Sequence, residues 1–95
     1  MPTYVVLTTL TDEGRKTLRD NPARIREVNA EMKAMGVTLK DQYALFGQYD
    51  FVNIIDAPDD AVMTKALMQL ASRGTVSTLT LPATPTEGFI KSLGG

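Results

Sequence analysis

The side chains best suited to chemistry or binding gather near one short turn, Gly47-Gln48-Tyr49-Asp50, and on the strand-like runs beside it. Asn53 is the only polar residue in the otherwise apolar run 51–55. A buried amide must find hydrogen-bond partners, because unpaired polar groups are costly away from water. One interpretation is that Asn53 pairs with Thr8, within the sheet or across a subunit interface.

A second interpretation makes the same amide part of a ligand site. Asn53, Thr8 and Tyr43 would then present hydrogen-bonding groups to a small cleft with apolar walls, which is the usual construction of such sites. The walls would be Val6, Phe51 and Ile55.

Three further residues have both a structural and a functional interpretation, and two glycines have a structural one. Asp50 either has a structural role, accepting hydrogen bonds from turn amides or fixing the start of the next strand, or lines an interface pocket that receives an amine or hydroxyl. Tyr49 either packs its ring or offers its hydroxyl at an interface. Arg73 either complements a helix C-terminus or binds an anion. Gly47 and Gly74 are predicted to supply backbone conformations that other residues avoid.

The composition restricts the chemistry that the chain can perform. Its 95 residues contain no cysteine and no histidine, so the usual thiolate and imidazole groups are absent. We therefore predict no catalytic residue, no metal and no cofactor. Asp41, Asp50 and Tyr43 would be the acid–base candidates of an enzyme.

Charge and hydropathy indicate which partners to expect. The chain has 10 Lys+Arg against 11 Asp+Glu, a balance that disfavours nucleic acid. No apolar stretch approaches the roughly 18 residues of a membrane span and no leader pattern is visible, so we expect a cytoplasmic protein.

The chain is predicted to form one domain over residues 1–95, with a tail at 84–95. Strands are expected at 4–10, 37–46, 51–55 and 75–81, and helical segments at 12–35 and 61–72. Pro22 should divide the first helical segment, with a restart in which Asn21 is the cap and Pro22 the first helical residue.

This order predicts an α+β fold, the ferredoxin-like split βαβ sandwich (βαββαβ). Its four-stranded antiparallel sheet would have the order 4-1-3-2, with the helices on one face. The central strands are apolar on both sides. We expect Val52 and Ile54 to meet the helices. The face without helices would then carry Tyr4, Val6, Thr8, Phe51, Asn53 and Ile55. Such a patch favours a sheet-on-sheet homo-oligomer. The tail is expected to dock on its own helices or on a neighbouring subunit.

The chain resembles the GYD-domain proteins. The resemblance rests on the opening Met1-Pro2-Thr3-Tyr4-Val5-Val6-Leu7-Thr8, on Gln42-Tyr43-Ala44, on Gly47-Gln48-Tyr49-Asp50-Phe51-Val52, on Ser72-Arg73-Gly74 and on Thr78-Leu79-Thr80-Leu81-Pro82. It is more distantly similar to the effector-binding domains of leucine-responsive regulators, through the turn and the run 74–80. The second resemblance implies assembly through the sheets and small effectors at subunit interfaces.

These observations lead to one functional expectation and two alternatives. We expect a homo-oligomer that binds a small polar metabolite at a subunit interface, and the question of enzymatic activity stays open. The alternatives are a dimeric α/β-barrel enzyme (a cofactor-light oxygenase, isomerase or lyase) and a purely structural or adaptor subunit.

Overall fold

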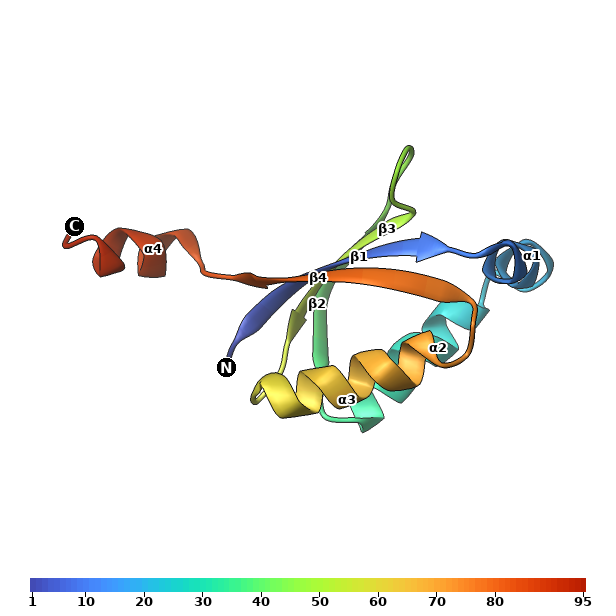
Figure 1. The fold of residues 1–95 in the computed structure, drawn as a ribbon, viewed down its shortest axis with the longest axis horizontal. Helices are drawn as coiled ribbons and strands as arrows, with labels where there is room; N and C mark the ends of the chain where they lie inside the picture. Colours follow the sequence, from blue (N-terminus) through green and yellow to red (C-terminus); the bar gives the residue numbers. More distant parts are fainter.

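A four-stranded antiparallel sheet carries its two longest helices on one face (Figure 1). A computed structural model describes residues 1–95. The elements are β1 (Thr3–Leu10), α1 (Asp12–Asp20), α2 (Arg24–Ala34), β2 (Thr38–Ala44), β3 (Phe51–Asp56), α3 (Asp60–Ala71), β4 (Val76–Ala83) and α4 (Thr86–Ser92). The strand order β2-β3-β1-β4 is the predicted order read from the other edge, so the predicted fold class is confirmed.

The predicted helix starts are largely confirmed. Thr11 caps α1 by accepting a hydrogen bond of 3.1 Å from the Gly14 N–H, and the Asp59 carboxylate caps α3. The predicted restart also occurs, but α2 begins at Arg24 rather than at Pro22. Pro22 instead lies in the intervening turn, where the Arg24 N–H donates to the Asn21 carbonyl at 3.1 Å.

The predicted facing of the two central strands is wrong. Alternate residues of β1 and β3 are buried on the side of the helices, and the intervening ones lie on the face without helices. The buried set is Tyr4, Val6, Thr8, Asn53 and Ile55. The prediction failed because it assumed that Asn53 would find no partner under the helices, whereas β1 and β2 supply its partners there.

A β-bulge at Lys40 changes which side chains of β2 point toward the helices. Leu39 pairs with Ile55 and Asp41 with Ile54, so Lys40 is an extra residue in the ladder. An uninterrupted alternation would have put Leu39 and Tyr43 on the same face. The bulge instead places Gln42 opposite Asn53 on the helix side and leaves Tyr43 on the other side.

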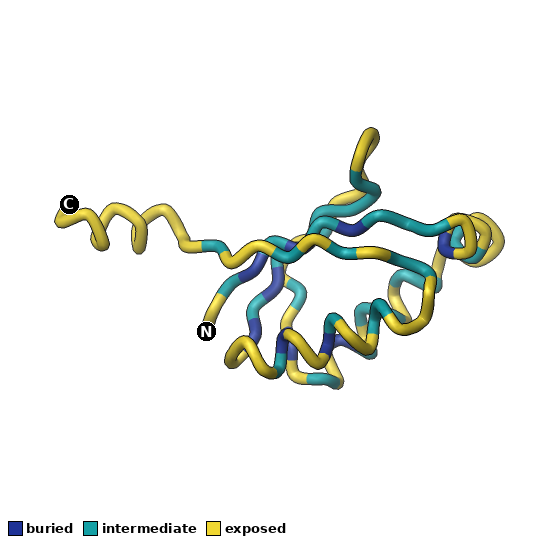
Figure 2. Tube along the Cα trace, in the orientation of Figure 1, coloured by how far each residue is buried: buried dark blue, intermediate teal, exposed yellow.

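The C-terminal part differs from the prediction at the end of the last strand. β4 continues through Pro82 to Ala83, which an edge strand tolerates because its outer N–H groups need no partner. α4 then projects away from the domain, and none of its residues is buried (Figure 2).

We predict that Gly14→Ala destabilises the domain. A Cβ at Gly14 would lie 2.1 Å from the Thr75 carbonyl oxygen, which also accepts the Thr11 N–H at 3.0 Å. The substitution should push α1 away from the start of β4 and lower the free energy of unfolding by about 1–3 kcal/mol, measured by urea denaturation.

Gly88→Ala in α4 is the matched control, because its nearest neighbour would be a Thr84 methyl carbon at 3.4 Å. It should leave the free energy of unfolding unchanged or slightly higher. A Gly14→Ala variant as stable as the control would contradict the close approach.

Candidate functional site

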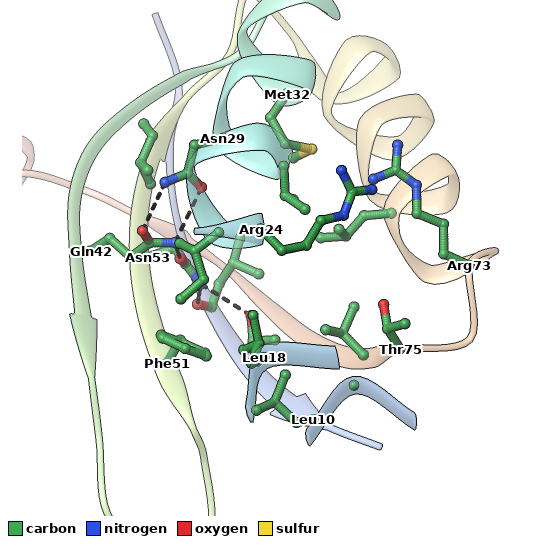
Figure 3. Close-up of a pocket in the computed structure, with 18 of the residues that line it drawn as sticks. Leu10, Leu18, Arg24, Asn29, Met32, Gln42, Phe51, Asn53, Arg73 and Thr75 are labelled. Carbon is green, nitrogen blue, oxygen red and sulfur yellow. Dashed lines mark hydrogen bonds between the residues drawn. The ribbon is translucent and has the colours of Figure 1, made fainter. Parts of the chain in front are cut away.

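A cavity of about 420 Å³ lies between the sheet and the helices (Figure 3). Its volume falls within the range of roughly 300–1,000 Å³ typical of small-molecule sites. The walls are mainly apolar and come from every layer of the domain. Examples are Val6, Leu18, Met32, Phe51, Ile55 and Leu70.

One wall of this cavity carries a continuous row of hydrogen-bonded polar side chains, which we call the amide row: Asn29, Gln42, Asn53 and Thr8. Asn29 Nδ2 donates to Gln42 Oε1 at 2.9 Å, and Gln42 Nε2 donates to Asn29 Oδ1 at 3.3 Å and to Asn53 Oδ1 at 2.8 Å. Asn53 Nδ2 donates to the Val6 carbonyl at 2.9 Å and to Thr8 Oγ1 at 3.1 Å. The buried amide of Asn53 therefore has a partner for both of its N–H groups and for its oxygen.

A second polar group, the arginine cluster of Arg24, Glu31 and Arg73, lies where α2 meets the end of α3. Glu31 accepts from Arg24 Nη1 at 3.3 Å and also contacts Arg73 Nη1. Figure 3 shows the Arg24 and Arg73 guanidinium groups close to one another, on the side of the cavity away from Asn29 and Gln42. The three side chains are about one-third exposed, at 33% for each arginine and 37% for Glu31, so the cluster forms the edge of the cavity.

The arginine cluster changes the ionisation of its members. Burial raises the pKa of Glu31, but the hydrogen bond and charge of Arg73, together with Arg24, outweigh it and hold that pKa below its ordinary value. The pKa of Arg24 is raised, mainly by its hydrogen bond to Glu27. Burial lowers this pKa, and the charge and hydrogen bond of Glu31 raise it further. Glu31 is therefore a carboxylate at neutral pH.

Three of the predicted ligand-binding residues line this cavity: Thr8, Asn53 and Arg73. The contact between Asn53 and Thr8 is the pairing that the sequence suggested. Val6, Phe51 and Ile55 form part of the walls, as in the cleft interpretation, but under the helices rather than on the opposite face. The ligand-binding role of these residues stays a prediction.

The other predicted residues lie elsewhere. Tyr43 is 63% exposed on the face without helices. Asp50 Oδ2 accepts the Leu10 N–H at 2.7 Å, so its carboxylate joins the start of β3 to the end of β1 through a strand amide, and not through the turn amides of the structural interpretation. Tyr49 is half-buried in the same turn. Gly47 and Gly74 have φ angles of +114° and +74°, the left-handed region predicted for them.

Sequence reasoning missed five polar residues that line the cavity: Thr17, Arg24, Asn29, Gln42 and Thr75. Asn29 follows Ile25 by four positions and precedes Met32 by three. Helical spacing therefore places it on the same apolar face, and this pattern could have identified Asn29 as a residue that points toward the sheet. Gln42 had no such signal, because only the bulge at Lys40 turns it toward the helices.

A further polar contact ties β1 to α3. The Tyr4 hydroxyl donates to Asp60 Oδ1, and this hydrogen bond, with burial and the charges of Asp60 and Asp59, raises the pKa of Tyr4 to about 12. The phenol therefore stays protonated at neutral pH.

No group of three or more His, Cys, Asp or Glu side chains is placed to hold a metal ion. Nor does any helix combine the length and apolarity needed to cross a membrane.

The fold and the cavity together define a small ferredoxin-like α+β domain. The GYD domain family matches residues 4–93, and the chain belongs to this family. The chain is 51% identical over 94 residues to a Thermus thermophilus protein named glutamine synthetase and cystathionine beta-lyase binding protein. The match covers 98% of this chain and 99% of that protein.

Three solved structures have the same fold. FFRP-DM1 has a TM-score of 0.60 and 19% identity, covering 88% of this chain and 100% of that one. TTHA0845 from Thermus thermophilus has a TM-score of 0.58 and 21% identity, with 90% and 95% covered. The hypothetical protein PHS023 from Pyrococcus horikoshii has a TM-score of 0.58 and 18% identity, with 90% and 92% covered. The predicted resemblance to the regulator effector domains is thus confirmed for the fold.

We predict that the contribution of Glu31 to stability disappears at acidic pH. Because its pKa is lower in the folded protein than in the unfolded chain, the stabilisation is fully present above its ordinary value of 4.5 and is lost as pH falls through the folded pKa. The difference in free energy of unfolding between the wild type and Glu31→Gln should therefore shrink below about pH 4.5, measured by urea denaturation across pH.

Asp12→Asn is the matched control, because Asp12 pairs only with Arg15 and its side chain is 94% exposed. Its effect should be small at every pH. A wild-type advantage over Glu31→Gln that stays constant down to about pH 3 would contradict the ion-pair account.

Proposed function

We propose that this protein is a binding module that attaches to a metabolic enzyme and assembles with further copies of itself. The observation that carries the first part is the 51% identity, over 98% of the chain, to a protein named for binding glutamine synthetase and cystathionine beta-lyase. Enzymes of these two kinds are the proposed partners.

Support for self-assembly comes from the sheet face that no helix covers, which we call the open face: Val5, Leu7, Tyr43, Val52, Ile54, Leu79 and Leu81. These side chains come from all four strands and lie next to one another in the ladder. Tyr43, Leu79 and Leu81 are 63%, 43% and 44% exposed. A contiguous apolar surface of this kind is typical of an interaction site.

A second copy of the chain is the proposed occupant of the open face. The β1–β4 side of this face has no charged side chain, whereas Asp41 lies opposite Ile54 on the edge strand β2. Two copies related by a twofold axis can therefore meet over β1 and β4 without burying an unpaired charge. α4 extends beyond the domain from β4, with Phe89, Ile90 and Leu93 exposed, and in this assembly it docks on the neighbouring copy.

The small polar metabolite expected at a subunit interface needs a different location. Thr8 and Asn53 point into the domain, and of the three cleft residues only Tyr43 lies on the open face. The open face is therefore proposed as a protein contact, and the cavity is the place to look for a small molecule.

We predict that Leu79→Glu weakens self-association. The substitution buries a charge at an interface made of apolar groups, so the apparent mass should fall toward that of the 10.4 kDa monomer in size-exclusion chromatography with light scattering. Met68→Glu is the matched control, because Met68 is 66% exposed on α3, in the helix layer. It should keep the mass of the wild type. A wild-type chain that is monomeric at all concentrations would contradict the assembly.

We predict direct binding to glutamine synthetase or cystathionine beta-lyase from the organism that encodes this chain. Immobilised protein should give a saturable, concentration-dependent response to at least one of the two purified enzymes in biolayer interferometry. An unrelated oligomeric enzyme of similar size should give none. The absence of a response to both enzymes would contradict the partner assignment and would leave the self-association result unaffected.

A further inference from the structure

We propose that the cavity between the sheet and the helices binds a small aliphatic carboxylate. Its carboxylate would contact the arginine cluster, and its hydrocarbon chain would lie against the apolar walls. This site is separate from the open face and does not depend on an enzyme partner.

The hydrogen bonding of the cavity indicates where a polar group of the ligand must lie. In the amide row, both N–H groups of Gln42 and both of Asn53 already have acceptors within the protein. In that wall only the second Asn29 N–H and the Thr8 hydroxyl have no acceptor within the protein, and both are neutral donors. The strongest remaining donors are at the arginine cluster.

Each guanidinium has five N–H donors in a planar fork that suits a carboxylate. In this structure the ion pairs use Nη1 of Arg24 and Nη1 of Arg73, and no acceptor of the chain binds the Nε or Nη2 groups. Arg73 contacts only Glu31, while Arg24 is shared between Glu31 and Glu27, whose side chain is 58% exposed. Arg73 is therefore the better anchor for a ligand carboxylate.

The shape and polarity of the cavity favour an aliphatic chain over a phosphorylated or sugar-like ligand. Of its 22 lining residues, 13 are hydrophobic, and Phe51 is the only aromatic one. A ligand polar along its whole length would leave hydroxyl or phosphate groups against Val28, Met32 and Leu70 without partners. Burial of methylene groups against these side chains, in contrast, is favourable.

The test is isothermal titration calorimetry of the delipidated protein with hexanoate, octanoate, decanoate and octan-1-ol. Affinity should rise with chain length until the cavity is full. Octanoate should bind about tenfold more tightly than octan-1-ol, because the alcohol offers the guanidinium one neutral acceptor in place of a charged, bidentate carboxylate. Failure of all four probes to bind, or equal binding of octanoate and octan-1-ol, would overturn the proposal.

Two variants of the arginine cluster should act in opposite directions. Arg73→Gln should weaken octanoate about tenfold and leave octan-1-ol unchanged, whereas Glu31→Gln should strengthen octanoate, because it removes the carboxylate that competes for Arg73. Arg19→Gln is the matched control, since Arg19 pairs with Asp20 and its side chain is 73% exposed. An Arg73→Gln variant that binds octanoate as tightly as the wild type would also overturn the proposal.

Methyl NMR separates the cavity from the open face and does not depend on any variant. Octanoate should shift the methyl signals of Met32, Val6 and Leu70, and leave those of Leu79 and Leu81 in place. Shifts confined to Leu79 and Leu81 would mean that the fatty acid only coats the exposed sheet, and would overturn the assignment to the cavity.

Discussion

The buried amide of Asn53 is the constraint on which the arrangement of this domain depends. An amide offers two donors and an acceptor, and each such group left unpaired away from water costs about 1–3 kcal/mol. Partners come from three elements: Val6 and Thr8 on β1, Gln42 on β2 and, through Gln42, Asn29 on α2. The side of the sheet that holds these partners is the side that the helices cover, so the hydrogen bonds and the layer arrangement depend on each other.

The bulge at Lys40 makes this network possible. If β2 had no bulge after the pair Thr38–Asp56, Asp41 would lie opposite Asn53. Gln42 would then point to the face without helices. Asn53 would then meet a carboxylate, which cannot donate to its oxygen. With the bulge, Gln42 reaches Asn53 at 2.8 Å, and Lys40 pairs its ammonium with Asp56 at 3.6 Å. One inserted residue therefore links the edge strand, the central strand and α2.

Much of the fold could be predicted because local signals are strong. The apolar runs, the break at Pro22 and the capping residues Thr11 and Asp59 determined the order of elements, and the topology followed from it. The facing of β1 and β3 could not be predicted, since both sides of these strands are apolar and the deciding hydrogen bonds involve residues remote in sequence. For the same reason, the sequence suggested the contact of Asn53 with Thr8 but not the cavity around it, whose walls come from all layers.

The sheet separates two surfaces that use alternate residues of the same strands. Along β1, Val6 and Thr8 face the cavity while Val5 and Leu7 face outward, because successive side chains point to opposite sides. The charged residues at the cavity edge are carried by the helix layer, and none of them contributes to the open face. Occupation of the cavity therefore need not expose or cover the open face, and the two surfaces can hold different partners at the same time.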